Sequence, residues 1–149
     1  MNNFIKIKNI NKKYEKNKTI KVLNDISFNF ESGKIYSIVG PSGSGKSTLL
    51  NLLSLIDFPS SGSIEINKIK INFENSIEND KIRAKNIGII YQDKNLLSDF
   101  SAIENVYLPN LLLSNDKSTS INLAKKIIKN VGLSSRLNHF PAELSGGEN

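Results

Sequence analysis

The sequence predicts an α/β domain in which antiparallel strands and a strand–loop–helix unit precede a helical C-terminal segment. Three observations indicate this class. The stretches FIKIKNI and ISFNFES alternate apolar with polar residues, as half-buried strands do. The stretch GKIYSIVG is more continuously apolar, and it leads through a glycine-rich turn into an apolar segment of helical character. From Asp93 onward the apolar residues recur with the spacing of helices.

The strands are expected mainly in the N-terminal part of the chain. Residues 4–10 and 26–32 are the two alternating strands, with a polar turn or loop at 11–19 between them. Residues 33–40 are expected to form a strand buried on both faces, which is the habit of parallel sheets. Two further strands are expected in a hairpin that turns at Asn67-Lys68. NIGIIYQ, at residues 86–92, predicts another buried strand.

Helices are expected on both sides of this second buried strand. KSTLLNLLSLIDF, at 46–58, is apolar almost all round, so we expect a helix that is covered on most sides and is ended by FPSSG. The polar stretch SIENDKIRAK is expected to form a short helix. SAIENVYLP and SINLAKKIIKNVGL predict two more helices, the second with Gly132 as its C-terminal cap.

Composition narrows the functional classes. The 149 residues, 38% of them hydrophobic and 23% charged, suffice for one globular domain with a sizeable core. The absence of cysteine excludes a disulfide framework and a cysteine zinc site. No apolar run is long enough for a signal peptide or a bilayer span, so a membrane connection is expected to come through a partner. The net charge of +6 is mostly scattered lysine, which favours a solvated surface over nucleic acid, an acidic polymer or an anionic membrane.

The stretch GPSGSGKS, Gly40 to Ser47, matches the phosphate-binding loop pattern G-x-x-x-x-G-K-[ST]. Its glycines permit backbone angles closed to other residues and remove side chains that would block phosphate groups. Backbone N–H groups can then point at phosphate oxygens, aided by the positive end of the following helix. Lys46 supplies a compact charge to the β- and γ-phosphates, and the Ser47 hydroxyl completes the coordination of magnesium. The loop therefore predicts nucleoside triphosphate binding.

The loop pattern alone does not name the reaction, because it serves GTPases, kinases, helicases and transport ATPases. The chain has no N-K-x-D motif, which a GTPase would use to bind guanine. A small kinase would need a lid and an acceptor pocket, and we see neither in the sequence. A glycine-rich turn that binds nothing is the structural alternative.

A second motif narrows the class. LSGGE, Leu144 to Glu148, resembles the signature motif LSGGQ of the ABC (ATP-binding cassette) ATPases. Residues 22–66 resemble the opening block of that family, IGIIYQDKNLL resembles its Q-loop region, and SAIENVYLP resembles the segment just after it. The resemblance covers essentially all 149 residues and is nearest to the lipoprotein-release and macrolide-export type. It implies a P-loop NTPase core of the ABC ATPase type, with an antiparallel β subdomain and a partial helical subdomain.

The resemblance also assigns site residues. Tyr14 would stack on the adenine, with a packing role as the alternative. Gln92 would touch the magnesium and γ-phosphate region, with a polar residue that merely ends a strand as the alternative. The signature would contact the nucleotide of a partner subunit from the start of a helix, through Ser145, Gly146, Gly147 and Glu148. The implied nucleotide ligands are Tyr14, Gly40, Pro41, Ser42, Gly43, Ser44, Gly45, Lys46, Ser47, Thr48 and Gln92, of which Ser47 and Gln92 also lie at the metal.

The resemblance implies ATP and Mg²⁺ as ligands and two kinds of protein partner. In the family, two ATP-binding subunits dimerise head to tail, so that each phosphate-binding loop faces the signature of the other. ATP binding closes this dimer, hydrolysis reopens it, and the loop that contains Gln92 passes the motion to transmembrane permease subunits. The implied function is ATP-driven transport, export rather than import, from the cytoplasmic face of the membrane and without nucleic acid. The cargo stays open among lipoproteins, peptides and drugs.

The resemblance stops at the signature. In the family a Walker B strand with an aspartate and a glutamate follows, and then a switch histidine; the only histidine here, His139, precedes the signature. We therefore assign no catalytic base and expect a single ABC domain incomplete at its C-terminus. Its nucleotide-binding core is expected at about 1–92 and its helical subdomain at 93–149.

Such a domain is expected to expose apolar surface beside the strand of the phosphate-binding loop. We also expect it to be marginally folded and to hydrolyse ATP inefficiently by itself. Two hypotheses follow. The chain is either the N-terminal part of a transport ATPase, or a short protein that binds nucleotide without hydrolysing it, as a regulator or a relic.

Overall fold

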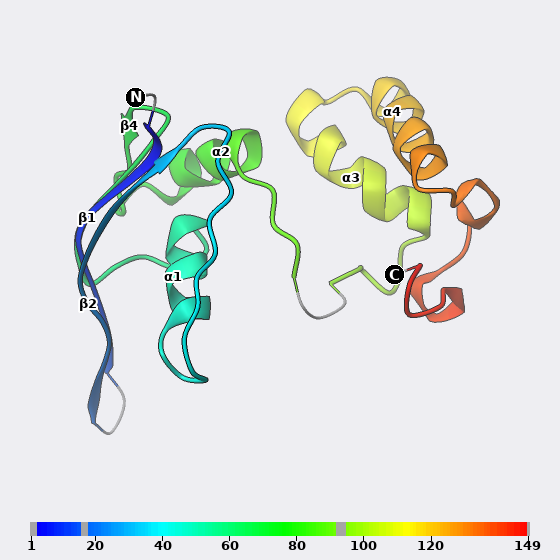
Figure 1. Cartoon of the computed structure of the whole chain (residues 1–149). Coiled ribbons are helices and arrows are strands. Elements are labelled where there is room, and N and C mark those ends of the chain that lie inside the picture. Colours follow the sequence, from blue (N-terminus) through cyan, green and yellow to red (C-terminus); the bar gives the residue numbers. More distant parts are fainter. Residues whose placement is uncertain (1–2, 16–17, 92–94, 149) are drawn as a thin grey trace. The chain divides into compact units, whose positions relative to one another are not determined.

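Two long strands, β1 (Asn3–Glu15) and β2 (Thr19–Glu31), pair antiparallel in the N-terminal part of this computed structural model (Figure 1). The structure describes residues 3–15, 18–91 and 95–148. The described sheet has four strands in the order β2-β1-β3-β4, with β3 (Ser61–Ile66) and β4 (Ile69–Lys70) added on the other side of β1. The chain divides into two compact units, 1–89 and 90–149, and each is treated by itself below.

The predicted hairpin at Asn67-Lys68 is confirmed. β3 and β4 pair antiparallel across these two residues, with Glu65 opposite Lys70. Asn67 has a φ of 48° and Lys68 a φ of 67°, so both turn residues are left-handed. Left-handed angles at both central residues are what a type I′ turn requires, and that turn matches the twist of the strands it joins.

One apolar core holds the first unit together. It lies between the sheet and α1 (Lys46–Leu53), and α2 (Ser76–Asn86) contributes one side chain. The N-terminus of α2 is capped by Asn75, whose side chain accepts a hydrogen bond from the Glu78 N–H. The buried members of the core are Ile7, Ile10, Leu23, Leu52, Leu53, Leu55, Ile64, Ile66, Ile71 and Ile82.

The helix predicted at 46–58 is shorter than expected. α1 ends at Leu53, because Leu55 adopts a left-handed φ of 55° and turns its side chain into the core, where it is 1% exposed. The helix is also less covered than its apolar sequence predicted, since Leu50 is 52% exposed. Burial of Leu55 therefore competes with continuation of the helix and prevails.

The buried strand predicted at 33–40 is wrong. Residues 34–40 form no strand, and Ile35 and Val39 are 100% and 84% exposed, because the described part of the chain offers them no strand to pair with. The segment is held instead by Tyr36, whose ring packs edge-on against Phe28 and whose hydroxyl accepts the backbone N–H of Glu31. The exposure of apolar surface beside the phosphate-binding loop was expected and is observed.

Two other secondary-structure predictions are wrong. The polar stretch 11–19 was predicted as a turn or loop, but Asn11–Glu15 continues β1 and pairs with β2 out to Thr19. Ladder hydrogen bonds between backbone groups need no apolar alternation, so a two-stranded ribbon can be polar on both faces. The strand predicted at 86–92 is not formed over the described residues 87–91, where Ile90 is fully exposed.

The second unit is helical, as predicted. It contains α3 (Ala102–Ser114), α4 (Lys117–Asn130) and two short 3₁₀ helices, η1 (Ser134–Arg136) and η2 (Pro141–Glu143). Ser101 and Glu104 form a capping box at the start of α3. The predicted cap at Gly132 is confirmed: its φ is 79°, its N–H bonds to Lys129 O, and the next N–H bonds to Ile128 O. Across the ranges that the structure describes, no helix has both the length and the apolar character needed to cross a membrane.

A glycine in β3 sets the distance between β1 and β3, and this generates a first prediction. A Cβ at Gly62, whose φ is 104°, would lie 2.5 Å from the carbonyl oxygen of Asn9 and 2.7 Å from that of Lys8. Gly62→Ala is therefore expected to lower the free energy of unfolding by roughly 3 kcal/mol or more, measured by urea denaturation followed by circular dichroism.

Gly33 offers the matched control. Its φ is also positive, at 75°, but a Cβ there would meet nothing within 4 Å. Gly33→Ala should cost only about 1 kcal/mol for the backbone angle. Equal losses in the two variants would contradict the close approach at Gly62.

Candidate functional site

The loop that leads into α1 has the backbone geometry that its glycines predicted. Gly43 and Gly45 are left-handed, with φ of 80° and 89°, and Gly45 is the N-cap of α1. A Cβ at Gly45 would lie 2.9 Å from a methyl group of Leu23 and 3.1 Å from the carbonyl oxygen of Val22. Only glycine combines this backbone angle with this close approach. The loop is thus seated against β2.

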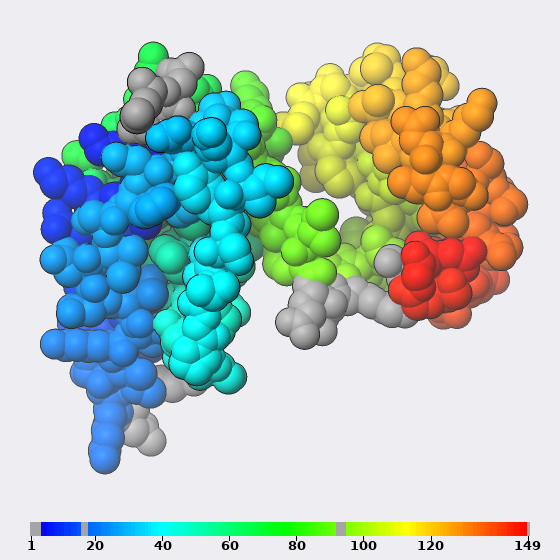
Figure 2. All heavy atoms as spheres, viewed as in Figure 1, coloured from blue at the N-terminus to red at the C-terminus, as the bar shows by residue number. Residues whose placement is uncertain are grey.

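A cavity of 230 Å³ opens at this loop. Figure 2 shows the segment that leads into α1, in cyan, on the surface of the first unit. The first intrahelical hydrogen bond of α1 joins the N–H of Leu49 to the carbonyl of Gly45. The N–H groups of the three residues before Leu49 therefore have no acceptor within the helix. Such groups, with the positive end of the helix dipole, favour an anion. The cavity is lined by Val22, Ser42, Gly43, Gly45, Lys46, Ser47 and Thr48.

Lys46 lies half-buried at this cavity and braces the loop. Its Nζ donates hydrogen bonds to the carbonyl oxygens of Gly40, at 2.9 Å, and of Pro41, at 2.7 Å. A third loop contact joins the N–H of Ser44 to the carbonyl of Pro41. The ammonium group is therefore held beside the cavity by neutral carbonyl groups, and no described carboxylate is within ion-pair distance of it. An anion with several oxygens could replace those carbonyl contacts.

Tyr14 lies in β1 and not in the polar loop where the sequence placed it. Its hydroxyl donates a hydrogen bond of 2.9 Å to Asp57 Oδ2, and 38% of the side chain is exposed. The hydrogen bond to Asp57 is the largest cause of a raised Tyr14 pKa; burial and the charge of Asp57 add to it, and a hydrogen bond with the Thr48 side chain opposes it. Tyr14 therefore lies close to Thr48 in the first turn of α1. Gln92 lies outside the described residues.

In the second unit, the signature residues form a turn. The N–H of Glu148 bonds to the carbonyl of Ser145, and the Glu148 carboxylate accepts the backbone N–H of Ser145 in return, at 2.9 Å. Glu148 also accepts a hydrogen bond of 2.9 Å from Arg136 Nε. A Cβ at Gly146 or Gly147 would meet nothing within 4 Å. Residues 145–148 thus form a turn in the described chain, and the helix that the sequence predicted to start here stays a prediction.

The environment of Glu148 favours its charged form. Its pKa is lowered to about 2, first by the hydrogen bond from Arg136 and then by those from the backbone and side chain of Ser145. The sequence had assigned Glu148 to the nucleotide of a partner, whereas here its carboxylate is engaged within its own chain.

Sequence reasoning missed three residues that these contacts bring into the sites. Lys12 and Asp57 adjoin Tyr14, and Arg136 adjoins the signature. None belongs to a motif, and the contacts join residues that are 45, 43 and 12 positions apart. Only the fold reveals them.

A family model and the sequences of known proteins relate this chain to the same class of protein. The family described as ABC transporter matches residues 23–149. The chain is 46% identical to the lipoprotein-releasing system ATP-binding protein LolD of Wigglesworthia glossinidia brevipalpis, over 99% of this chain and 66% of that protein. It is 41% identical to the protein of the same name from Rickettsia bellii, over 99% of this chain and 65% of that protein. The chain thus spans slightly less than two thirds of the length of these relatives.

Solved structures give the same result for the fold. The chain is similar to an ATP-binding cassette solved as a dimer in a post-hydrolysis state, bound to ADP and Pi, with a TM-score of 0.87 and 36% sequence identity. The match covers 97% of this chain and 64% of that one. A second dimeric structure, of a bacterial ABC transporter cassette, matches with a TM-score of 0.86 and 37% identity. The α/β fold of the ABC ATPase type that the sequence predicted is therefore confirmed.

The contact between Arg136 and Glu148 generates a second prediction. Arg136→Gln is expected to raise the Glu148 pKa from about 2 toward the ordinary carboxyl value of 4.5, because Arg136 is the largest cause of the shift. The pKa is measured by a carboxyl ¹³C NMR titration. A lowered pKa stabilises the folded turn fully above the unfolded value, so this stabilisation should be lost as the pH falls from about 4.5 through about 2.

Arg83→Gln is the control, because it removes an ion pair with Asp80 and a hydrogen bond to the Leu55 carbonyl, both in the first unit, and leaves the signature alone. Glu148 should keep its low pKa in that variant. A pKa that stays near 2 in Arg136→Gln would show that the contacts with Ser145 hold the carboxylate without the arginine.

Proposed function

Because this chain belongs to the ABC transporter family, we propose that it is the ATP-binding subunit of a transporter and that Gly40–Thr48 hold the phosphate tail of ATP. One observation carries the proposal. Left-handed glycines, a half-buried lysine ammonium and the first-turn N–H groups of α1 all lie at one cavity of 230 Å³. This is a cradle for a polyvalent anion at a helix N-terminus.

The residues present fit the phosphate part of a nucleotide. Pockets for a whole drug-sized ligand typically measure roughly 300–1,000 Å³. The smaller cavity at the loop suits the phosphate end of the molecule, with the base and ribose outside it. We propose that the base stacks on Tyr14, which is partly exposed and lies close to Thr48 in the first turn of α1.

Each loop residue then has a definable role. Lys46 would exchange its hydrogen bonds to two loop carbonyls for charge-assisted bonds to phosphate oxygens, which are stronger. Ser47, which lines the cavity, would be a protein ligand of Mg²⁺, an ion that takes few protein ligands and keeps several waters. Bound Mg²⁺ would neutralise part of the negative charge of the phosphates. Gln92 is proposed at the same ion, although it lies outside the described residues.

Hydrolysis and transport are proposed for the whole protein. Residues of this chain would bind and orient the phosphates, and we assign none of them to the activation of water. The identity of 46% to a protein named as part of a lipoprotein-releasing system supports lipoprotein release as the transport step. It does not favour the alternative of a short nucleotide-binding protein without hydrolytic activity. The subunit would act at the cytoplasmic face of a membrane through a transmembrane permease partner.

A second copy of the subunit is proposed as the other partner. The solved cassettes similar to this chain are dimers. We propose a head-to-tail dimer in which Ser145–Glu148 approach the γ-phosphate of the ATP bound by the partner. The signature turn supports this role because its two glycines are exposed and leave the backbone open to an approaching anion.

The phosphate-binding role of Lys46 is a third prediction. Lys46→Ala is expected to weaken MgATP binding by roughly tenfold to a hundredfold, because it removes charged hydrogen bonds to the phosphates. Binding is measured by isothermal titration calorimetry. Lys34→Ala is the control, since Lys34 is exposed and lies in the same segment before the loop. Unchanged ATP affinity in Lys46→Ala would refute the assignment of the site.

The proposed dimer gives a fourth prediction. Gly146→Arg adds a long side chain where a Cβ meets nothing, so the subunit should fold and still bind ATP through its own loop. Its ATP-dependent dimerisation, measured by analytical ultracentrifugation, should be lost. Gly88→Arg, at a glycine of the first unit with similarly open surroundings, should keep it. A dimer that forms equally in both variants would exclude the signature from the interface.

A further inference from the structure

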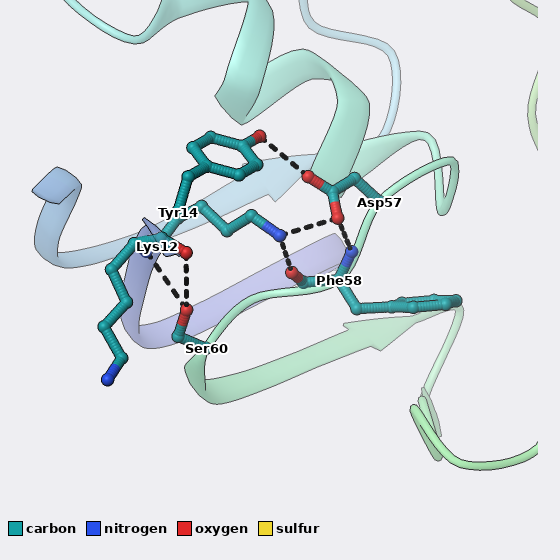
Figure 3. Close-up of polar contacts among 6 residues, drawn as sticks. Lys12, Tyr14, Asp57, Phe58 and Ser60 are labelled. Carbon is teal, nitrogen blue, oxygen red and sulfur yellow. Dashed lines mark hydrogen bonds and ion pairs between the residues drawn. The ribbon is translucent and has the colours of Figure 1, made fainter. Parts of the chain in front are cut away.

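A lysine of β1 is held unusually far from solvent. The side chain of Lys12 is 11% exposed, and its ammonium donates to Asp57 Oδ1 at 2.6 Å and to the carbonyl oxygen of Phe58 at 2.7 Å (Figure 3). Lysine is rarely buried unless it is paired, and here the pairing is with one carboxylate and one carbonyl. The ion pair therefore fixes the segment that follows α1 against β1.

Tyr14 uses the second oxygen of the same carboxylate. Its hydroxyl donates to Asp57 Oδ2 at 2.9 Å, and the Lys12 ammonium lies 4.8 Å from the centre of its ring. Figure 3 shows the Lys12 and Tyr14 side chains both directed at Asp57. The tyrosine is thus constrained twice, by a hydrogen bond at its hydroxyl and by a cation–π contact at its ring.

Asp57 is itself immobilised. Its Oδ1 also accepts the N–H of Phe58, at 2.7 Å, and Ser60 exchanges hydrogen bonds with both backbone groups of Lys13. Burial raises the pKa of Asp57, but the hydrogen bonds from Lys12, Tyr14 and Phe58 outweigh it and hold the pKa below its ordinary value. The carboxylate is therefore charged at neutral pH and has acceptor geometry fixed on both oxygens.

This network lies beside the proposed phosphate cradle. Asp57 comes four residues after the end of α1, and Thr48, in the first turn of α1 and at the cavity, is close enough to Tyr14 to oppose the rise of its pKa. Tyr14 therefore lies close to the first turn of α1. It also keeps 38% of its surface exposed, which leaves ring surface for a ligand.

We propose that Lys12 and Asp57 are positioning residues for base recognition, which hold the ring of Tyr14 in one orientation at the edge of the phosphate cradle. The inference rests on the proposed function, because it requires a nucleotide at Gly40–Thr48. A ring fixed in advance loses little side-chain freedom when a purine stacks on it, so more of the stacking free energy appears as affinity. Neither Lys12 nor Asp57 needs to touch the nucleotide.

The test compares two ligands that share phosphates and differ in the base. Affinities for MgATP and for magnesium tripolyphosphate are measured on the full chain. Tyr14→Phe removes the fixing hydrogen bond and Asp57→Asn removes the charge of its acceptor, and each is expected to lower ATP affinity about threefold to tenfold. Tripolyphosphate affinity should not change. Tyr14→Ala removes the ring and should cost about tenfold or more in ATP affinity alone.

Coupling between the two residues separates positioning from a general structural role. In the Tyr14→Phe/Asp57→Asn double variant, the loss should be no greater than in Asp57→Asn alone, because Tyr14→Phe removes an interaction that Asp57→Asn already disrupts. Lys13→Gln is the control, since it breaks an exposed ion pair with Glu15 on the same strand. It should leave both affinities unchanged.

Each of the other possible outcomes would overturn a specific part of the proposal. Equal losses for ATP and tripolyphosphate in Asp57→Asn would show that Asp57 supports only the fold. If the ratio of ATP affinity to tripolyphosphate affinity is unchanged in Asp57→Asn and Tyr14→Phe but falls in Tyr14→Ala, the ring needs no positioning. If the wild-type chain binds neither ligand, the proposed function itself fails. Should Asp57→Asn not fold, as judged by circular dichroism, Tyr14→Phe probes the same hydrogen bond from its other end.

Discussion

The packing of α1 against the antiparallel sheet is the interaction on which the rest of the first unit depends. Leu52 and, just beyond the helix, Leu55 are almost fully buried among isoleucines of β1 and β3. Full burial of a leucine contributes about 1.5–3 kcal/mol, so these residues fix the helix, and the helix fixes the loop before it. Gly45 completes the arrangement, because its missing side chain lets the loop rest on Val22 and Leu23. The cradle is therefore seated on the antiparallel sheet, although residues 34–40 before it have no strand partner in the described part of the chain.

Both candidate ligand-binding regions use the same device for rigidity. In each, a carboxylate at a bend accepts hydrogen bonds from a basic side chain and from a backbone N–H: Asp57 from Lys12 and Phe58, and Glu148 from Arg136 and Ser145. The pKa of each carboxyl group is lowered. A charged acceptor held in this way orders a loop without apolar burial, which suits segments that must stay open to a ligand.

The sequence predicted those features whose cause is local. The turn at Asn67-Lys68, the cap at Gly132 and the left-handed glycines of the loop follow from a few adjacent residues, and the structure contains all three. The sequence-based prediction failed where a residue's structure depends on a pairing partner far away in the chain. The apolar stretch 33–40 was predicted as a buried strand, yet a strand needs a neighbour to pair with, and none is present among the described residues. In the site, the loop motif was evident, but Asp57 approaches Lys12 and Tyr14 only because β1 and the segment after α1 lie side by side.

The most direct test of nucleotide binding is to map where MgATP perturbs the backbone amides of the isotope-labelled chain by NMR. The largest shifts are predicted within Gly40–Thr48, because Ser42, Gly43 and Gly45–Thr48 line the cavity that would receive the phosphates. Smaller shifts are predicted around Tyr14, where the base would stack. Saturable MgATP binding that leaves Gly40–Thr48 unperturbed, or the absence of any binding, would contradict nucleotide binding at this loop.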